Sequence, residues 1–76
     1  MPRTPIAAQI VADYIALIES GELPFGAKLP SQGELAAKYD ASETPVKRAL
    51  RELQLRGYIE GASGRGNFVI WRASGS

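Results

Sequence analysis

Basic side chains recur at helical spacing in the second half of the chain. Lys47, Arg48 and Arg51 fall on one side of a helix drawn at about 100° per residue. Residues 47–76 carry six Lys and Arg against two Glu, whereas residues 1–46 carry three Lys and Arg against six Asp and Glu. A cationic region on one side of a molecule favours contact with an anionic partner. The alternative is an ordinary solvated helix face.

The chain lacks the groups on which most enzyme and metal chemistry depends. Its 76 residues include no cysteine and no histidine, so thiolate and imidazole ligands are missing, as is the usual proton shuttle near neutral pH. Asp13, Asp40 and the glutamates show no paired-carboxylate or metal-ligand spacing, and there is no base-activated nucleophile. We therefore expect a protein that is not an enzyme and holds no cofactor or metal.

Length and composition indicate one folded domain. A chain of 76 residues, 45% of them apolar, can build a single core. We expect the domain to span residues 1–71 and a flexible tail to occupy residues 72–76. The apolar runs are far shorter than the roughly 20 residues that cross a bilayer. We therefore expect a cytoplasmic protein with no membrane partner.

The first predicted helix has Thr4 as its N-cap and Pro5 as its first residue, and Gly21 ends it. Its apolar stripe is Ile6, Ile10, Tyr14, Leu17 and Ile18, widened by Val11 and Ile15. The glycines and prolines of residues 21–30 predict a connector with a short extended piece at 27–29. Its apolar side chains are expected to fold back onto the core: Leu23, Phe25 and Leu29.

A capping box predicts the start of the second helix. The Ser31 hydroxyl would accept from the third N–H of this helix, and Glu34 would bond back to Ser31. Residues 40–42 break the helix, because Asp and Ser favour turns and caps. Ser42 is predicted to cap a third helix that runs to about Arg56. Its buried stripe is Val46, Ala49, Leu50 and Leu53.

After Gly57 the apolar period changes from about 3.6 to 2, which predicts a β-hairpin. Its strands are residues 58–60 and 67–71, joined by a glycine-rich loop at 61–66. Arg65 is the charged residue of this loop, and an arginine at such a tip can enter a minor groove or bind phosphate. An inert flexible turn is the alternative. A nucleotide-binding loop is disfavoured, because the Gly-Lys-Ser/Thr ending and the following helix are missing.

The second and third predicted helices match a helix-turn-helix arrangement. A turn of three or four residues joins them, and the second of the pair presents basic and hydroxyl side chains opposite its buried stripe. One helix fits the major groove of DNA, which is about 12 Å wide. The outward side chains are Thr44, Lys47, Arg48, Arg51 and Leu55. The residues alone therefore favour an α+β domain that binds duplex DNA.

Short strings along nearly the whole chain combine into a family pattern. They are residues 18–31, 34–36, 46–53, 57–59, 64–66 and 68–69, with Ser42 and Thr44. Together they resemble the N-terminal winged-helix domain of GntR-family bacterial transcriptional regulators. The resemblance covers about residues 6–71 and implies a winged helix-turn-helix, three helices followed by a two-stranded wing. It also implies a regulator, expected to be a repressor, that binds a palindromic operator as a dimer.

The resemblance implies which side chains meet DNA. Ser31 would donate to a phosphate, and Arg65 with Gly66 would form the wing tip in the minor groove. The positions at or on the recognition helix in the major groove are Ser42, Glu43, Thr44, Lys47 and Arg48, to which the helical wheel adds Arg51.

Three residues depart from the family pattern. Gly33 and Glu43 stand where the family usually has Arg, and Pro45 stands where it commonly has Thr. Glu43 would repel phosphate unless it accepts from a cytosine amino group, a pairing that major-groove geometry permits.

Two expectations concern other partners. Full-length family members carry an effector-binding domain after the wing, whereas so small a chain has little room for a pocket of about 300 Å³ or more, so we expect no small-molecule effector. The alternative function is protein assembly without DNA binding, anchored by Leu55, Tyr58 and Trp71. Against it, Tyr58 and Trp71 are expected to complete the core under the wing.

Overall fold

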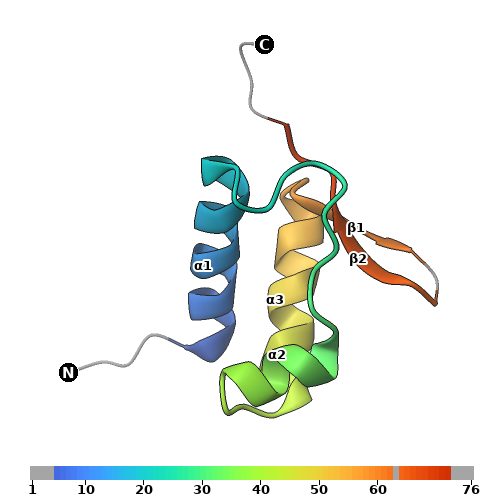
Figure 1. The fold of residues 1–76 in the computed structure, drawn as a ribbon. Helices are drawn as coiled ribbons and strands as arrows, with labels where there is room; N and C mark the ends of the chain where they lie inside the picture. The colour runs from blue at the N-terminus through green and yellow to red at the C-terminus, as the bar shows by residue number, and fades with distance from the viewer. Residues whose placement is uncertain (1–4, 63, 73–76) are drawn as a thin grey trace.

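The computed structural model describes residues 5–62 and 64–72 and shows three helices followed by a hairpin (Figure 1). The helices are α1 (Ile6–Ser20), α2 (Gln32–Lys38) and α3 (Glu43–Leu55), and the antiparallel strands are β1 (Ile59–Ala62) and β2 (Gly66–Val69). The helices cluster together, and the hairpin projects away from them. The predicted α+β class and the predicted order of elements are confirmed.

One hydrophobic core joins the helices to the base of the hairpin. The buried side chains are Ile10, Val11, Tyr14 and Ile18 of α1, Leu35 of α2, Val46, Ala49, Leu50 and Leu53 of α3, Ile59 and Val69 of the strands, and Leu29. The α3 stripe is the predicted one. Because that stripe is fully buried, the opposite face of α3 is held toward solvent.

The first helix begins one residue later than predicted. Pro5, with ψ 144°, occupies the N-cap position, and its carbonyl accepts from the Gln9 N–H at 3.0 Å. Its extended backbone keeps Pro5 outside the helix, which corrects its assignment as the first helical residue. Thr4, the predicted cap, lies outside the described residues. Gly21 ends α1 as predicted, at φ +91°, which glycine adopts without a Cβ clash.

Ser31 and Glu34 form the predicted capping box. The Glu34 N–H donates to Ser31 Oγ at 3.1 Å, and the Ser31 N–H donates to Glu34 Oε1 at 2.8 Å. The bond from the Ser31 N–H lowers the pKa of the Glu34 carboxyl. After α2 the chain turns at Asp40, at φ +51°, and the Ala41 N–H donates to the Ala36 carbonyl at 2.9 Å. This tight turn leads directly into α3.

Ser42 takes the predicted N-cap position of α3, but its hydroxyl makes no capping hydrogen bond. Such a hydroxyl accepts from the N–H of the second or third helical residue. Pro45 is the third residue of α3 and has no N–H. The Thr44 N–H remains, but the Ser42 hydroxyl does not accept from it either, so the predicted capping by the side chain is wrong, whereas the helix start is right. The predicted end is also confirmed, with Arg56 as the C-cap and Gly57 at φ +82°.

Both strands extend further toward the turn than predicted. Their register runs from Ile59 opposite Val69 to Ala62 opposite Gly66, so the predicted loop at 61–66 is too long. Pairing leaves residues 63–65 between the strands, of which Ser63 lies outside the described residues. Gly64 at φ +74° and Gly66 at φ +100° supply the left-handed backbone that lets the chain reverse so tightly. At the other end, β2 stops at Val69 rather than Trp71.

The connector between α1 and α2 adds an extended segment beside β2. Lys28 forms an antiparallel bridge with Phe68, and the Leu29 N–H donates to the Asn67 carbonyl at 2.9 Å. The predicted extended piece at residues 27–29 is therefore confirmed. It ties the connector to β2, from Phe68 to Asn67 near the turn.

One of the connector's predicted core residues is exposed. Leu29 is buried and Leu23 is half-buried, as expected, but Phe25 is 54% exposed. A turn at Phe25 and Gly26 directs the ring outward, where the Arg72 guanidinium lies 4.2 Å from its centroid. Arg72 apart, the predicted tail at 72–76 falls outside the described residues. Among residues 5–62 and 64–72, no helix has the length and apolarity needed to cross a membrane.

Candidate nucleic-acid interface

The exposed face of α3 carries three cations. Lys47, Arg48 and Arg51 are all exposed, and none of them forms an ion pair with another described residue. The salt bridge that the described residues do contain joins Arg56 Nε to Glu52 Oε2 at 2.6 Å, four residues apart on the same helix. No described carboxylate therefore compensates the charges of these three exposed cations.

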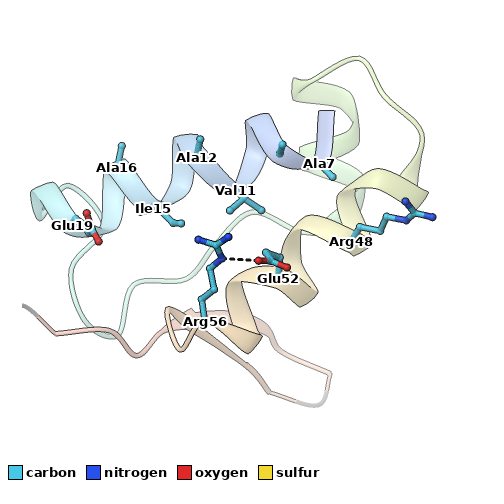
Figure 2. Close-up of a pocket in the computed structure, with 10 residues that line it drawn as sticks. Ala7, Val11, Ala12, Ile15, Ala16, Glu19, Arg48, Glu52 and Arg56 are labelled. Atoms are coloured by element: carbon cyan, nitrogen blue, oxygen red, sulfur yellow. Dashed lines mark hydrogen bonds and ion pairs between the residues drawn. The ribbon is translucent and has the colours of Figure 1, made fainter. Parts of the chain in front are cut away.

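The neighbours on the two flanks of α3 show in which direction its basic face points. On one flank, Arg48, Glu52 and Arg56 face α1 across a groove of about 700 Å³, and the Arg48 side chain points away from the Glu52–Arg56 pair (Figure 2). On the other flank, the Gln54 amide bonds to the wing at Asn67. Lys47, Arg51 and Gln54 follow one another at spacings of four and three. The basic face therefore lies between the groove and the wing.

The groove corrects one expectation. A chain of this size was expected to have little room for a hollow of about 300 Å³ or more. The structure contains an open groove of about 700 Å³ along α1 and α3. Four alanines of α1 are among the residues that line it: Ala7, Ala8, Ala12 and Ala16.

The N-terminal ends of α2 and α3 hold the remaining predicted residues of the helix-turn-helix. Ser31, Ser42, Glu43 and Thr44 are all exposed. Glu43 is in the first turn of α3, where its carboxylate interacts favourably with the positive end of the helix dipole. The Ser42 hydroxyl has no capping bond to satisfy, so it is available to an external partner. Glu43 therefore stabilises α3 but would repel a phosphate that approached this end of the helix.

The predicted wing tip is exposed and backbone-rich. Arg65 lies between Gly64 and Gly66, both of which have positive φ, and it is exposed in the turn that joins the paired strands. A neighbouring surface can approach the backbone of such a turn closely. The structure places this tip on a different element from α3, so the two predicted contacts depend on how the hairpin is held.

Lys28 is a basic residue that sequence reasoning did not assign to the site. It is exposed and bridges to Phe68, so its side chain runs along β2 toward the turn. A Cβ added at Gly66 would lie 3.3 Å from Lys28 Cε. The predicted extended piece at residues 27–29 was the feature that could have revealed it, because pairing with a strand brings this lysine beside the wing. It adds a cation next to Arg65.

Two tyrosines fix α1 to the elements that carry the site. The Tyr39 hydroxyl, at the end of α2, donates to Asp13 Oδ2 at 2.8 Å, and burial together with this bond raises the pKa of Tyr39. The Tyr58 hydroxyl donates to Glu19 Oε2 at 2.5 Å, and this bond raises the pKa of Tyr58. In both bonds the phenol is the donor, so each bond needs the neutral form of the tyrosine.

The comparison with protein families decides where this fold belongs. The family model described as "Bacterial regulatory proteins, gntR family" matches residues 6–69. The chain belongs to the gntR family. A similar protein is the uncharacterized HTH-type transcriptional regulator YdfD of Bacillus subtilis, 41% identical over 70 residues, which are 92% of this chain and 14% of YdfD.

A second similar protein from Bacillus subtilis is the HTH-type transcriptional repressor YtrA, 39% identical over 66 residues, 87% of this chain and 51% of YtrA. The chain therefore spans about half the length of YtrA and a much smaller share of YdfD. Among solved structures, AraR(DBD) in complex with operator ORX1 superposes with a TM-score of 0.83 at 25% identity, covering 88% of this chain and 81% of that one. The predicted winged helix-turn-helix fold is confirmed.

These relatives are named as transcriptional regulators, not as enzymes. Within the part of the chain that the structure describes, no group of three or more Asp and Glu side chains is placed to hold a metal ion. The DNA-contacting roles of the individual residues stay predictions.

Proposed function

We propose that this chain is the DNA-binding domain of a bacterial transcriptional regulator that acts as a repressor in the cytoplasm. Its α3 enters the major groove of an operator and its wing tip enters the adjacent minor groove. One observation carries the proposal: α3 buries its apolar stripe and presents Lys47, Arg48 and Arg51 outward, with no ion pair from them to any residue in 5–62 or 64–72. A solved complex of AraR(DBD) with an operator, similar in fold at a TM-score of 0.83, supports it.

The roles of the site residues follow from where they lie. Arg48 and Arg51 lie near the middle of α3, where a helix in the major groove reaches base edges, and arginine pairs bidentately with guanine. Ser31, Ser42, Thr44 and Lys47 contact phosphates and fix the register of the helix. Arg65 and Gly66 enter the minor groove, whose narrow A·T-rich forms attract arginine.

Selection of bound duplexes from a random pool, followed by fluorescence anisotropy, tests the proposal. We expect a preferred, palindromic sequence with two half-sites about one helical turn apart, because two copies of the domain bind together. Replacing Arg48 or Arg51 with Ala should reduce discrimination between duplexes, and replacing Lys47 should weaken all duplexes about equally. A selected pool no different from the starting pool would contradict sequence-specific binding.

The alternative function, protein assembly without DNA, has less support. Tyr58 and Trp71 stack on each other with ring centroids 5.7 Å apart and pack against the core, so they are not free anchors. Leu55 is 72% exposed; it follows the basic residues of α3 in the sequence and directly precedes Arg56. A Leu55→Ala variant with unchanged duplex affinity but lost self-association would favour assembly.

A further inference from the structure

One side-chain hydrogen bond joins α3 directly to the hairpin in the described part of the chain. Gln54 Nε2, in the last turn of α3, donates to Asn67 Oδ1 on β2 at 2.9 Å. Asn67 directly follows Gly66, the tip residue of the predicted minor-groove contact. The bond therefore connects the helix to the strand close to the end of the wing.

Gly61 lies against this amide pair. It is opposite Asn67 in the strand register, and a Cβ added at Gly61 would lie 3.1 Å from Gln54 Nε2 and 3.4 Å from Asn67 Oδ1. Gly61 does not have a positive φ, so its backbone conformation does not require glycine. The amides nevertheless lie so close that a side chain at Gly61 would have to displace them by a few tenths of an ångström.

The rest of the hairpin is held from the opposite edge and at its base. The Leu29 N–H and the Ala27 carbonyl bond to β2 at Asn67 and Val69, at 2.9 and 2.8 Å. A two-stranded hairpin has little stability by itself, so its angle depends on such attachments. The connector fixes one edge of β2, and core packing of Ile59 and Val69 holds the base of the hairpin. The Gln54–Asn67 bond adds a side-chain hydrogen bond from α3 to β2 nearer the turn.

We propose that Gln54 and Asn67 are positioning residues that set the angle between the wing and the recognition helix. This inference rests on the proposed function, because it concerns simultaneous contact of both elements with one duplex. With the bond intact, binding of α3 delivers Arg65 to the adjacent groove with little further loss of freedom. Without it, the wing samples other angles, and its contribution to affinity falls.

A double-mutant cycle tests this role. Gln54→Met keeps the length of the side chain and removes its hydrogen-bond donor, and Arg65→Ala removes the charge at the wing tip. We expect Gln54→Met to weaken binding of the selected operator duplex about 3- to 10-fold in the native background, and to have almost no effect in the Arg65→Ala background. Gln9→Met, on the exposed part of α1, is the matched control and should bind normally.

An equal loss in both backgrounds would show a merely structural role and overturn the inference. Thermal melting of each variant identifies a loss of folding. If Gln54→Met does not fold, the exchanged pair Gln54→Asn with Asn67→Gln, which keeps one amide of each length, replaces it in the same cycle. Restored coupling to Arg65 in this variant supports the role, and absent coupling overturns it.

A measurement without DNA separates this inference from the proposed function. Amide order parameters from NMR relaxation at Gly64, Arg65 and Gly66 should fall in Gln54→Met, while those of α3 stay the same. Unchanged order parameters would overturn the positioning role even if the domain binds DNA. Absence of duplex binding by the unaltered domain, with the fall in order parameters observed, would overturn the proposed function and leave the bond as a structural attachment only.

Discussion

The salt dependence of duplex binding follows from the number of free cations. Eight Lys and Arg lie among residues 5–62 and 64–72, and three of them have partners within the protein. Lys38 lies over the rings of Tyr14 and Tyr39, Arg56 pairs with Glu52, and Arg72 covers Phe25. The other five are exposed without such partners: Lys28, Lys47, Arg48, Arg51 and Arg65.

Each cation that neutralises a phosphate contributes about −0.9 to the slope of log K against log salt concentration. If all five contact phosphate, the slope is about −4.5 per protomer, and if two of them read bases instead it is about −2.7. Replacing Lys28 or Lys47 with Ala should therefore make the slope less steep by about 0.9 for each substitution. Arg56→Ala is the matched control, because its charge is already paired, and it should leave the slope unchanged.

Fluorescence anisotropy with a labelled duplex, measured between about 50 and 200 mM salt, gives these slopes directly. A slope near zero for the unaltered domain would refute the assignment of the basic face. Equal effects of Arg56→Ala and Lys47→Ala would refute the distinction between paired and free cations.

Four further outcomes follow from local structure. Leu53→Ala, at a fully buried position of α3, should lower the free energy of unfolding by about 2–5 kcal/mol in urea titrations, and a loss under about 1 kcal/mol would show that the core is not closed there. Because the folded-state pKa of Glu34 is lowered, its stabilisation is complete above the unfolded pKa, near 4.5, and is lost as pH falls through the folded pKa. The melting temperature of Glu34→Gln should thus converge with that of the unaltered domain at low pH, and a constant difference between pH 3 and 7 would argue against the capping box. Glu43→Gln should strengthen binding to random duplex at low salt, since a charge that opposes phosphate is removed; weaker binding would mean that Glu43 makes a favourable contact. Gly66→Ala should weaken binding, because a φ of +100° strains a residue that has a Cβ and because the Lys28 side chain, 3.3 Å from that Cβ, would have to shift. Unchanged affinity would mean that the wing tip does not contact DNA.

The helices were predictable because the residues that determine where each helix starts, ends and packs lie close together in the sequence. Ser31 with Glu34, the buried stripe of α3, and Gly57 after it each act within a few residues along the chain. The error at Ser42 has the same origin: the residue type indicates a cap, but Pro45 removes the N–H that the hydroxyl would bind.

The hairpin and its surroundings were less predictable because they depend on pairing between distant segments. Gly61 and Gly66 read as loop residues, yet one makes room for the Gln54–Asn67 amides and the other closes a turn beside Lys28. Lys28 precedes the hairpin by more than 30 residues and joins the wing only through its bridge to Phe68. The spacing of residues within the connector does not indicate that Lys28 pairs with Phe68.

NMR titration of the ¹⁵N-labelled domain with the selected operator duplex locates the DNA-binding surface residue by residue. We expect the largest amide shifts over residues 42–51 and 64–67, with α1 residues 8–16 little changed. Shifts concentrated on the α1 side of the groove, with α3 and the wing tip unaffected, would show that DNA does not bind at α3 and the wing.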